Sequence, residues 1–140
     1  MNRDLENCKS VLHAEGCTCV ARQDGQLYTA TERGIRPLMQ WLESGVLRGA
    51  VLADKVIGKA AAFLLEKGGV TAIYADVISV PAAEVLDHAE IAYSFRTKVP
   101  YIQNRAGNGM CPMENAVLSV KDADEAYVIL QETLQRLSAS

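Results

Sequence analysis

Hydrophobic and polar positions follow a helical period first and then a strand period. Apolar residues recur at helical spacing over residues 4–14, and Gly16 can end that helix. Residues 17–23 and 27–31 alternate between apolar and polar, as half-buried strands do. Asp24-Gly25 between them is a strong signal for a tight turn. The start of the chain therefore predicts a helix followed by a β-hairpin.

The remaining chain alternates helical and strand patterns. Pro37 suits the first turn of a short helix that ends near Gly45. The elements expected after it are a strand over 50–53, a helix over 58–67, a strand over 70–79, a helix from Pro81 to about His88, a strand over 91–95, a loop over 99–110, a helix over 112–119, and a last helix that Asp122 and Glu125 cap as a D-x-x-E box. This alternation predicts an α/β fold, a three-layer αβα sandwich around a mixed five-stranded sheet, in one domain over residues 1–140.

Composition narrows the classes of protein that fit. A chain of 140 residues that is 49% hydrophobic suits one packed core. The formal net charge is −3 and the positive residues are scattered, so the sequence does not favour a nucleic-acid partner. No apolar stretch reaches the roughly 18–20 residues of a membrane span, so no membrane partner is expected. Residues 1–10 are polar and unlike a signal or transit peptide, which predicts the cytoplasm.

The four cysteines are expected to be reduced thiols. The chain is too rich in core residues to depend on disulfides, and it shows no export signal. Cys17 and Cys19 form a C-x-C pair with no second pair to match it. We therefore expect no structural zinc site and no cofactor.

The order helix, hairpin, αβαβα resembles the cytidine-deaminase-like fold, over roughly residues 4–137. In that family, His-Ala-Glu opens one core helix and Pro-Cys-x-x-Cys opens the next. Lys59-Ala60-Ala61 stands at the first position here and Pro81-Ala82-Ala83-Glu84-Val85 at the second, so both lack the zinc ligands. The chain looks most like a small uncharacterised prokaryotic family of this fold that lacks the zinc motifs. The segments that carry this likeness are Gly58-Lys59-Ala60, Ala75-Asp76-Val77-Ile78-Ser79, Asn104-Arg105 and Cys111-Pro112-Met113-Glu114.

What the resemblance implies is a fold and self-association into a homo-oligomer, but no reaction. His13-Ala14-Glu15 and His88-Ala89-Glu90 both spell the deaminase tripeptide away from its place in the fold. A zinc deaminase needs three ligands, an activated water and a Glu that shuttles the proton. Neither tripeptide is followed by the remaining ligands at the required spacing. A zinc-dependent nucleoside or base deaminase is therefore the least favoured of the three functions considered.

Cys111 is the first candidate for chemistry. It follows a Gly-rich loop and precedes Pro112, which places it at the N-cap of a helix. The positive end of a helix lowers the pKa of a thiol and raises the fraction of nucleophilic thiolate. Glu114 falls at the third helical position, where it would close a capping box or act on the thiol as a base. The alternative is that Cys111 is a small buried cap residue and Glu114 only a cap.

Lys59 is the second candidate, because a cation is unfavourable at a helix start unless it has another role. It could contact a carboxylate or a phosphate at the carboxyl edge of the sheet, where open α/β folds bind ligands. The alternatives are a solvated lysine or a pair with Asp54. Asp54 and Ser79 are each expected to end a strand on this edge. Asp54 would orient Lys59 or bind a hydroxyl, while Ser79 would bind ligand or simply cap the next helix.

The loop before Cys111 supplies two further ligand-binding candidates, Asn104 and Arg105. Arg105 could hold an anion with two parallel hydrogen bonds. Asp76 lies within an apolar strand and needs a partner if it is buried. His13 and His88 are expected at the surface, at helix ends.

Two classes of function remain open from the sequence. The first is a metal-independent enzyme or binder of a small anionic or nucleoside-like ligand, with Cys111 as nucleophile and Lys59 and Arg105 as anion contacts. The second is a non-catalytic relative that kept the fold for binding or assembly. A polar pocket shared by Cys111, Lys59 and Asp54 would favour the first class, and a closed edge would favour the second.

Overall fold

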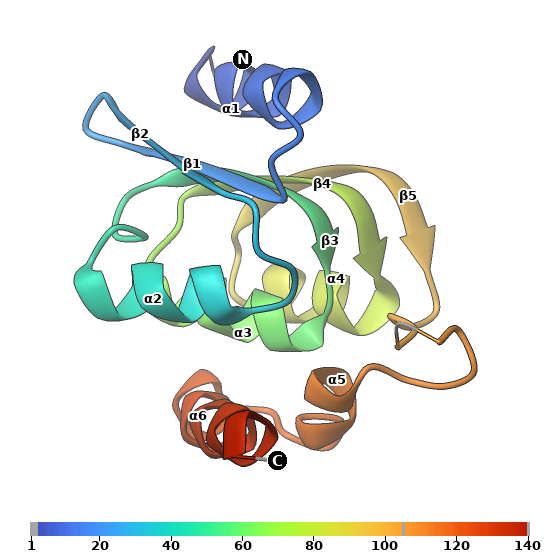
Figure 1. The fold of residues 1–140 in the computed structure, drawn as a ribbon. Coiled ribbons are helices and arrows are strands. Elements are labelled where there is room, and N and C mark those ends of the chain that lie inside the picture. The colour runs from blue at the N-terminus through green and yellow to red at the C-terminus, as the bar shows by residue number, and fades with distance from the viewer. Residues whose placement is uncertain (1–2, 105, 140) are drawn as a thin grey trace.

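The structure is a computed structural model that describes residues 3–104 and 106–139. The predicted order of elements is confirmed throughout (Figure 1). In chain order the elements are α1 (Arg3–Ala14), β1 (Cys19–Gln23), β2 (Gln26–Ala30), α2 (Arg36–Ser44), β3 (Val51–Ile57), α3 (Lys59–Gly68), β4 (Ala72–Ser79), α4 (Val80–His88), β5 (Ala92–Val99), α5 (Pro112–Ala116) and α6 (Ala123–Ala139).

The strands form one mixed five-stranded sheet, as predicted, and their order is β2-β1-β3-β4-β5. β1 is antiparallel to both β2 and β3, whereas β3, β4 and β5 run parallel. The hairpin turns at Asp24 and Gly25, whose φ angles of 48° and 79° are those of a type I′ turn. Parallel neighbours require crossovers, and α3 and α4 supply them.

Helices cover the two faces of the sheet unequally (Figure 1). α1 lies alone on one face, mainly over β1 and β3, while α2, α3 and α4 line the other. α5 and α6 lie beyond that second layer, with α6 packed on α3. The predicted α/β sandwich is therefore present, and the C-terminal helices add a layer outside it. On the α1 face, β5 has no helix of the described residues above it.

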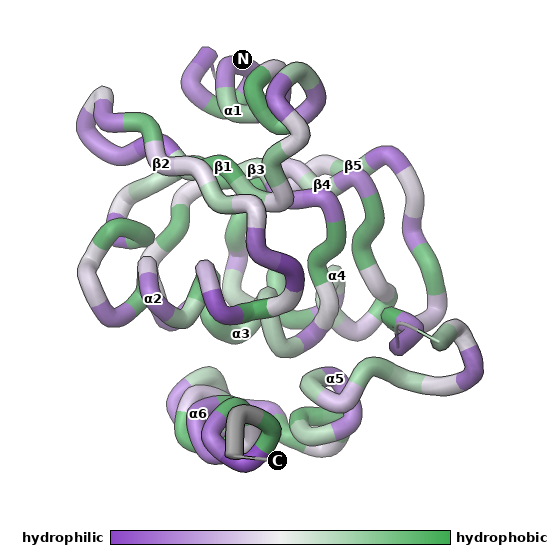
Figure 2. The backbone as a smooth tube through the Cα atoms, in the orientation of Figure 1, coloured by the Kyte–Doolittle hydropathy of each residue, from purple (hydrophilic) through white to green (hydrophobic). Residues whose placement is uncertain are grey.

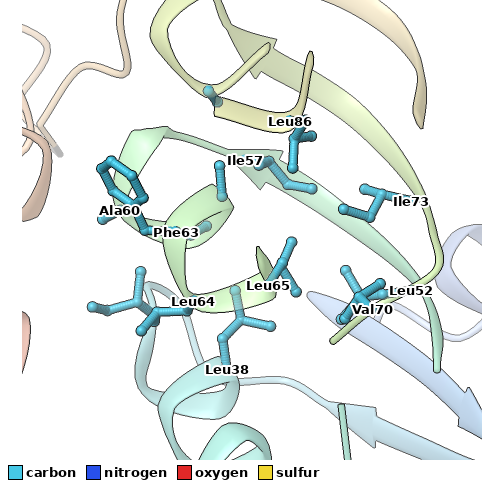
Figure 3. Packing of buried hydrophobic residues seen from close by; sticks show 14 of the residues in the cluster. Leu38, Leu52, Ile57, Ala60, Phe63, Leu64, Leu65, Val70, Ile73 and Leu86 are labelled. Carbon is cyan, nitrogen blue, oxygen red and sulfur yellow. The ribbon is translucent and has the colours of Figure 1, made fainter. Parts of the chain in front are cut away.

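The main core lies between the sheet and α3. Figure 3 shows Leu65 of α3 between Leu38 of α2 and Leu52 of β3, all three with almost no exposed surface. In Figure 2, hydrophobic residues recur along this helix and along the inner strands of the sheet. A smaller cluster lies under α1 on the opposite face of the sheet. Its buried members are Cys8, Leu12, Cys17, Val20, Val51, Ala53 and Tyr74.

Three predicted boundaries were wrong. β3 does not stop at residue 53 but continues to Ile57, because pairing with β4 carries it across the polar residues Asp54 and Lys55. β5 likewise continues four residues past Phe95, along β4 to Val99. α5 ends at Ala116, three residues short of the expected end. At the ends of β3 and β5, polar residues predicted that the strand stops, but pairing with β4 extends it.

No helix within the described part of the chain is long and apolar enough to cross a membrane.

Candidate functional site

The carboxyl ends of β3 and β4 lie at one edge of the sheet, where α3 and α4 begin. At the start of α4, the Ser79 hydroxyl accepts a hydrogen bond of 3.1 Å from the backbone N–H of Ala82. Ser79 has no exposed surface, so the expectation that it caps this helix is confirmed. The Ser79 hydroxyl therefore serves as a cap of α4 within the chain.

At the start of α3 the cap comes from a residue far along the chain. The carboxylate of Glu114, on α5, accepts hydrogen bonds of 2.6 Å and 2.8 Å from the backbone N–H groups of Lys59 and Ala60. These are two of the N–H groups that a helix cannot satisfy internally. The negative charge also lies at the positive end of the α3 dipole. The predicted capping box within α5 is wrong, because the backbone N–H of Cys111 donates to Ile102 and Glu114 reaches α3.

Burial dominates the electrostatics of Glu114. Only 7% of the residue is exposed, and this desolvation raises the pKa of its carboxyl above the usual value. The hydrogen bonds from Ala60 and Lys59 and the charge of Lys59 lower the pKa but do not cancel the effect of burial.

Gly58 makes room for this carboxylate. A Cβ atom at position 58 would overlap the Glu114 carboxylate. The φ angle of Gly58 is −99°, which any residue can adopt, so the glycine is required by close approach and not by backbone conformation. The Gly58-Lys59 pair that suggested a ligand site from the sequence is thus explained by a contact within the chain.

The Lys59 side chain is also used internally. Its ammonium donates a hydrogen bond of 2.8 Å to the backbone carbonyl of Leu118, just beyond α5. Among the described residues, no ion pair joins Lys59 to Asp54. Two contacts therefore link the start of α3 to the α5 segment. The Glu114 side chain binds the backbone of α3, and the Lys59 side chain binds the backbone just beyond α5.

Cys111 is the N-cap residue of α5, as predicted, but its thiol makes no capping hydrogen bond. The residue is half-buried and packs against the main core. The other three cysteines are buried, and no disulfide joins any of the four. Cys111 is thus the one thiol that solvent reaches.

Asp54 lies inside β3, opposite Cys19 of β1, and not at the end of the strand as expected. Burial raises the pKa of its carboxyl to about 7, against the lowering effect of hydrogen bonds from the Val56 backbone N–H and the Cys19 thiol. Burial also raises the pKa of the Cys19 thiol, and the neighbouring Asp54 carboxyl adds to that rise. Asp54 and Cys19 form a buried pair within the sheet, and no hydrogen bond of Asp54 to Lys59 or Cys111 is present in the described chain.

Of the two ligand-binding candidates in the loop before Cys111, the structure describes Asn104. Asn104 accepts a hydrogen bond of 3.2 Å from the backbone N–H of Asn108 and donates one of 3.0 Å to its side chain. This closes the loop on itself, and Gln103 bridges to Met110 at its base. Arg105 lies outside the described residues. A separate groove of about 510 Å³ lies between α2 and α6, away from these candidates, and is lined by Arg36, Met39, Gln40, Glu43, Gln131, Leu134 and Gln135.

A second polar cluster, on the α1 face of the sheet, was not predicted as a site. His13, in the last turn of α1, donates from Nε2 to the Asp76 carboxylate at 2.7 Å, and the Tyr74 hydroxyl donates to the same oxygen at 2.7 Å. Burial opposes ionisation of Asp76, but the hydrogen bonds from Tyr74 and His13 and the charges of His13 and Arg96 outweigh it, so the pKa of this carboxyl is lowered. The one signal in the sequence was an acidic residue inside an apolar strand.

Together, the fold and the strand-end site define an α/β protein with a mixed five-stranded sheet whose central helix is capped by an internal carboxylate. The chain belongs to the family described as TM1506, Domain of unknown function (DUF1893), whose model matches residues 7–134. A similar solved structure is the crystal structure of a DUF1893 family protein (TM1506) from Thermotoga maritima. It has 26% sequence identity and a TM-score of 0.88, and the match covers 94% of this chain and 90% of that one. Comparison with the curated proteins gives no match.

Replacing Glu114 tests its role as the cap of α3. Glu114→Ala leaves the buried N–H of Ala60 and the part-buried N–H of Lys59 without an acceptor, so we expect the free energy of unfolding to fall by about 2–3 kcal/mol, as measured by urea denaturation. Glu114→Gln keeps one acceptor oxygen and should lose less. Gly58→Ala should destabilise the native protein but cost much less in the Glu114→Ala background. Additive effects of the two substitutions would contradict the contact.

The Asp54 carboxyl predicts a pH dependence of stability. Its pKa of about 7 in the folded state exceeds the ordinary 3.8, so the folded protein binds more protons than the unfolded chain between these values. The free energy of unfolding should therefore decrease as pH rises through this range, by at most about 1.4 kcal/mol per pH unit. Asp54→Asn should flatten the profile, whereas Asp24→Asn, the same change at an exposed turn, should not. Identical profiles for the two variants would overturn this assignment.

Proposed function

We propose that this protein keeps a cytidine-deaminase-like fold for binding or assembly and has no catalytic centre at the strand ends. The observation that carries this proposal is the Glu114 carboxylate on the start of α3, the position where the resemblance would place the deaminase motif. The strand order β2-β1-β3-β4-β5 and the crossovers by α3 and α4 support this choice of fold.

Two further predicted site residues, Ser79 and Lys59, support the same proposal. The Ser79 hydroxyl is taken up by α4, and the Lys59 ammonium by the carbonyl of Leu118. A small anionic or nucleoside-like ligand at this edge would have to displace Glu114, whose two hydrogen bonds are charge-assisted. The chain's own carboxylate thus fills the place of an anionic ligand.

The resemblance also implies a homo-oligomer, and we propose self-association as the way in which the fold is used. Three large apolar side chains of the outer layer are about half exposed and are candidates for contact with a second copy. These are Leu118, Val128 and Leu137.

Amide NMR of the whole chain tests the closed edge. Titration with inorganic phosphate or with cytidine should leave the Lys59 and Ala60 amide signals unchanged, because Glu114 already occupies both N–H groups. Glu114→Ala frees these groups, and phosphate should then shift both signals. A saturable shift of the Lys59 and Ala60 signals in the native chain would refute the proposal.

The partial exposure of Cys111 favours one second candidate, a metal-independent enzyme with Cys111 as nucleophile. Iodoacetamide should alkylate Cys111 before the buried Cys8, Cys17 and Cys19, read by peptide mass spectrometry under native conditions. A nucleophilic role requires a rate at pH 7 at least about tenfold above that of a free cysteine peptide. The closed edge predicts a rate no higher than that of the peptide.

A further inference from the structure

The His13–Asp76 pair has the geometry of an oriented imidazole. Asp76 is 11% exposed at its side chain and ionised, so it accepts the Nε2–H of His13. That hydrogen bond assigns the tautomer, and neutral His13 then carries its lone pair on Nδ1. The His13 side chain is 41% exposed, and no described residue bonds its Nδ1. A carboxylate that fixes one nitrogen and leaves the other to solvent is the arrangement that prepares imidazole for chemistry.

Two cations lie beside Tyr74 and Asp76, the two residues that His13 contacts. Lys9, one helical turn before His13, holds its ammonium 4.5 Å from the centre of the Tyr74 ring, the ring that His13 also meets edge-on. Arg96 of β5 is level with Asp76, because Ala75 pairs with Phe95 and Val77 with Thr97. The charge of Arg96 acts on both Asp76 and Tyr74. A histidine flanked by two cations suits an anionic substrate.

The cluster opens onto an uncovered part of the sheet. α1 lies over β1 and β3 and reaches β4, whereas no helix of the described chain covers β5 on that face (Figure 1). Ser94 and Arg96 of β5 are exposed there. A small molecule can therefore reach His13 from the β5 side without any movement of the main core.

We propose that His13, oriented by Asp76 and flanked by Lys9 and Arg96, is a phosphoryl-accepting nucleophile for small phosphoryl donors of the phosphoramidate or acyl-phosphate class. The Nδ1 lone pair attacks phosphorus, and the new N–P bond forms as the bond from phosphorus to the leaving group breaks. That bonding pair stays with the leaving group, which takes its proton from solvent. The Nε2–H remains donated to Asp76, and the two cations pair with the phosphoryl oxygens.

Phosphoramidate is the probe, and His88 is an internal control in the same chain. His88 is exposed at the end of α4 and is the second of two histidines. We expect peptide mass spectrometry under basic, phosphohistidine-preserving conditions to show one phosphoryl group on His13, formed at least about tenfold faster than on His88. Equal rates at the two histidines would overturn the proposal.

The variant Asp76→Asn distinguishes a role of Asp76 in phosphorylation of His13 from a role that only holds α1 on the sheet. Asp76→Asn should bring the His13 rate down toward that of His88. Cys8, on the buried face of α1, should remain protected from alkylation if the helix stays in place. A full rate in Asp76→Asn with Cys8 still protected would refute the orienting role.

If Asp76→Asn releases α1 from the sheet, two matched substitutions on β5 test whether an anion site exists at His13. Arg96→Gln removes the cation beside Asp76, whereas Lys98→Gln removes one that lies 5.3 Å from the centre of the Phe95 ring. Arg96→Gln should slow phosphorylation of His13 several-fold, and Lys98→Gln should not. Equal rates in these two variants would rule out an anion site at His13.

Discussion

The capping of α3 by Glu114 is the contact on which the arrangement of the other helices depends. α2, α4, α5 and α6 all contact α3, so its position sets theirs relative to the sheet. Its first N–H groups are buried and would have no acceptor without Glu114. A buried, unsatisfied N–H group costs about as much as several well-made hydrogen bonds contribute. One carboxylate from α5 therefore both completes the central helix and attaches the C-terminal part of the chain to it.

The two faces of the sheet have different chemistry. The helix-covered face holds the large core, and its polar groups at the strand ends are satisfied by neighbours within the chain. The α1 face holds a small apolar cluster beside a polar one, and its β5 edge is open. Polar groups that lie next to an open surface remain available to ligands. Ligand chemistry is therefore expected on the α1 face of the sheet, away from the strand ends where α3 and α4 begin.

The fold was largely predictable from the sequence because its signals are local. The type I′ turn at Asp24-Gly25, the proline at the start of α2 and the periodicity of each helix depend on neighbours in the chain. The site was not predictable, because its contacts are long-range. Glu114 was expected to serve its own short helix, and nothing in the sequence indicates that it caps a helix 55 residues earlier. His13 and Asp76, 63 residues apart, were each noticed but could not be paired.

The close approach of Gly58 and Glu114 has a consequence for the history of this family. Because the carboxylate fills the space that a Cβ atom would need, neither position can change freely while the other is kept. A relative that gains a side chain at position 58 must shorten or lose the acid at position 114, and must then supply another acceptor for the start of α3. We therefore expect the two positions to vary as a pair, and a relative that lacks both would have this edge of the sheet open.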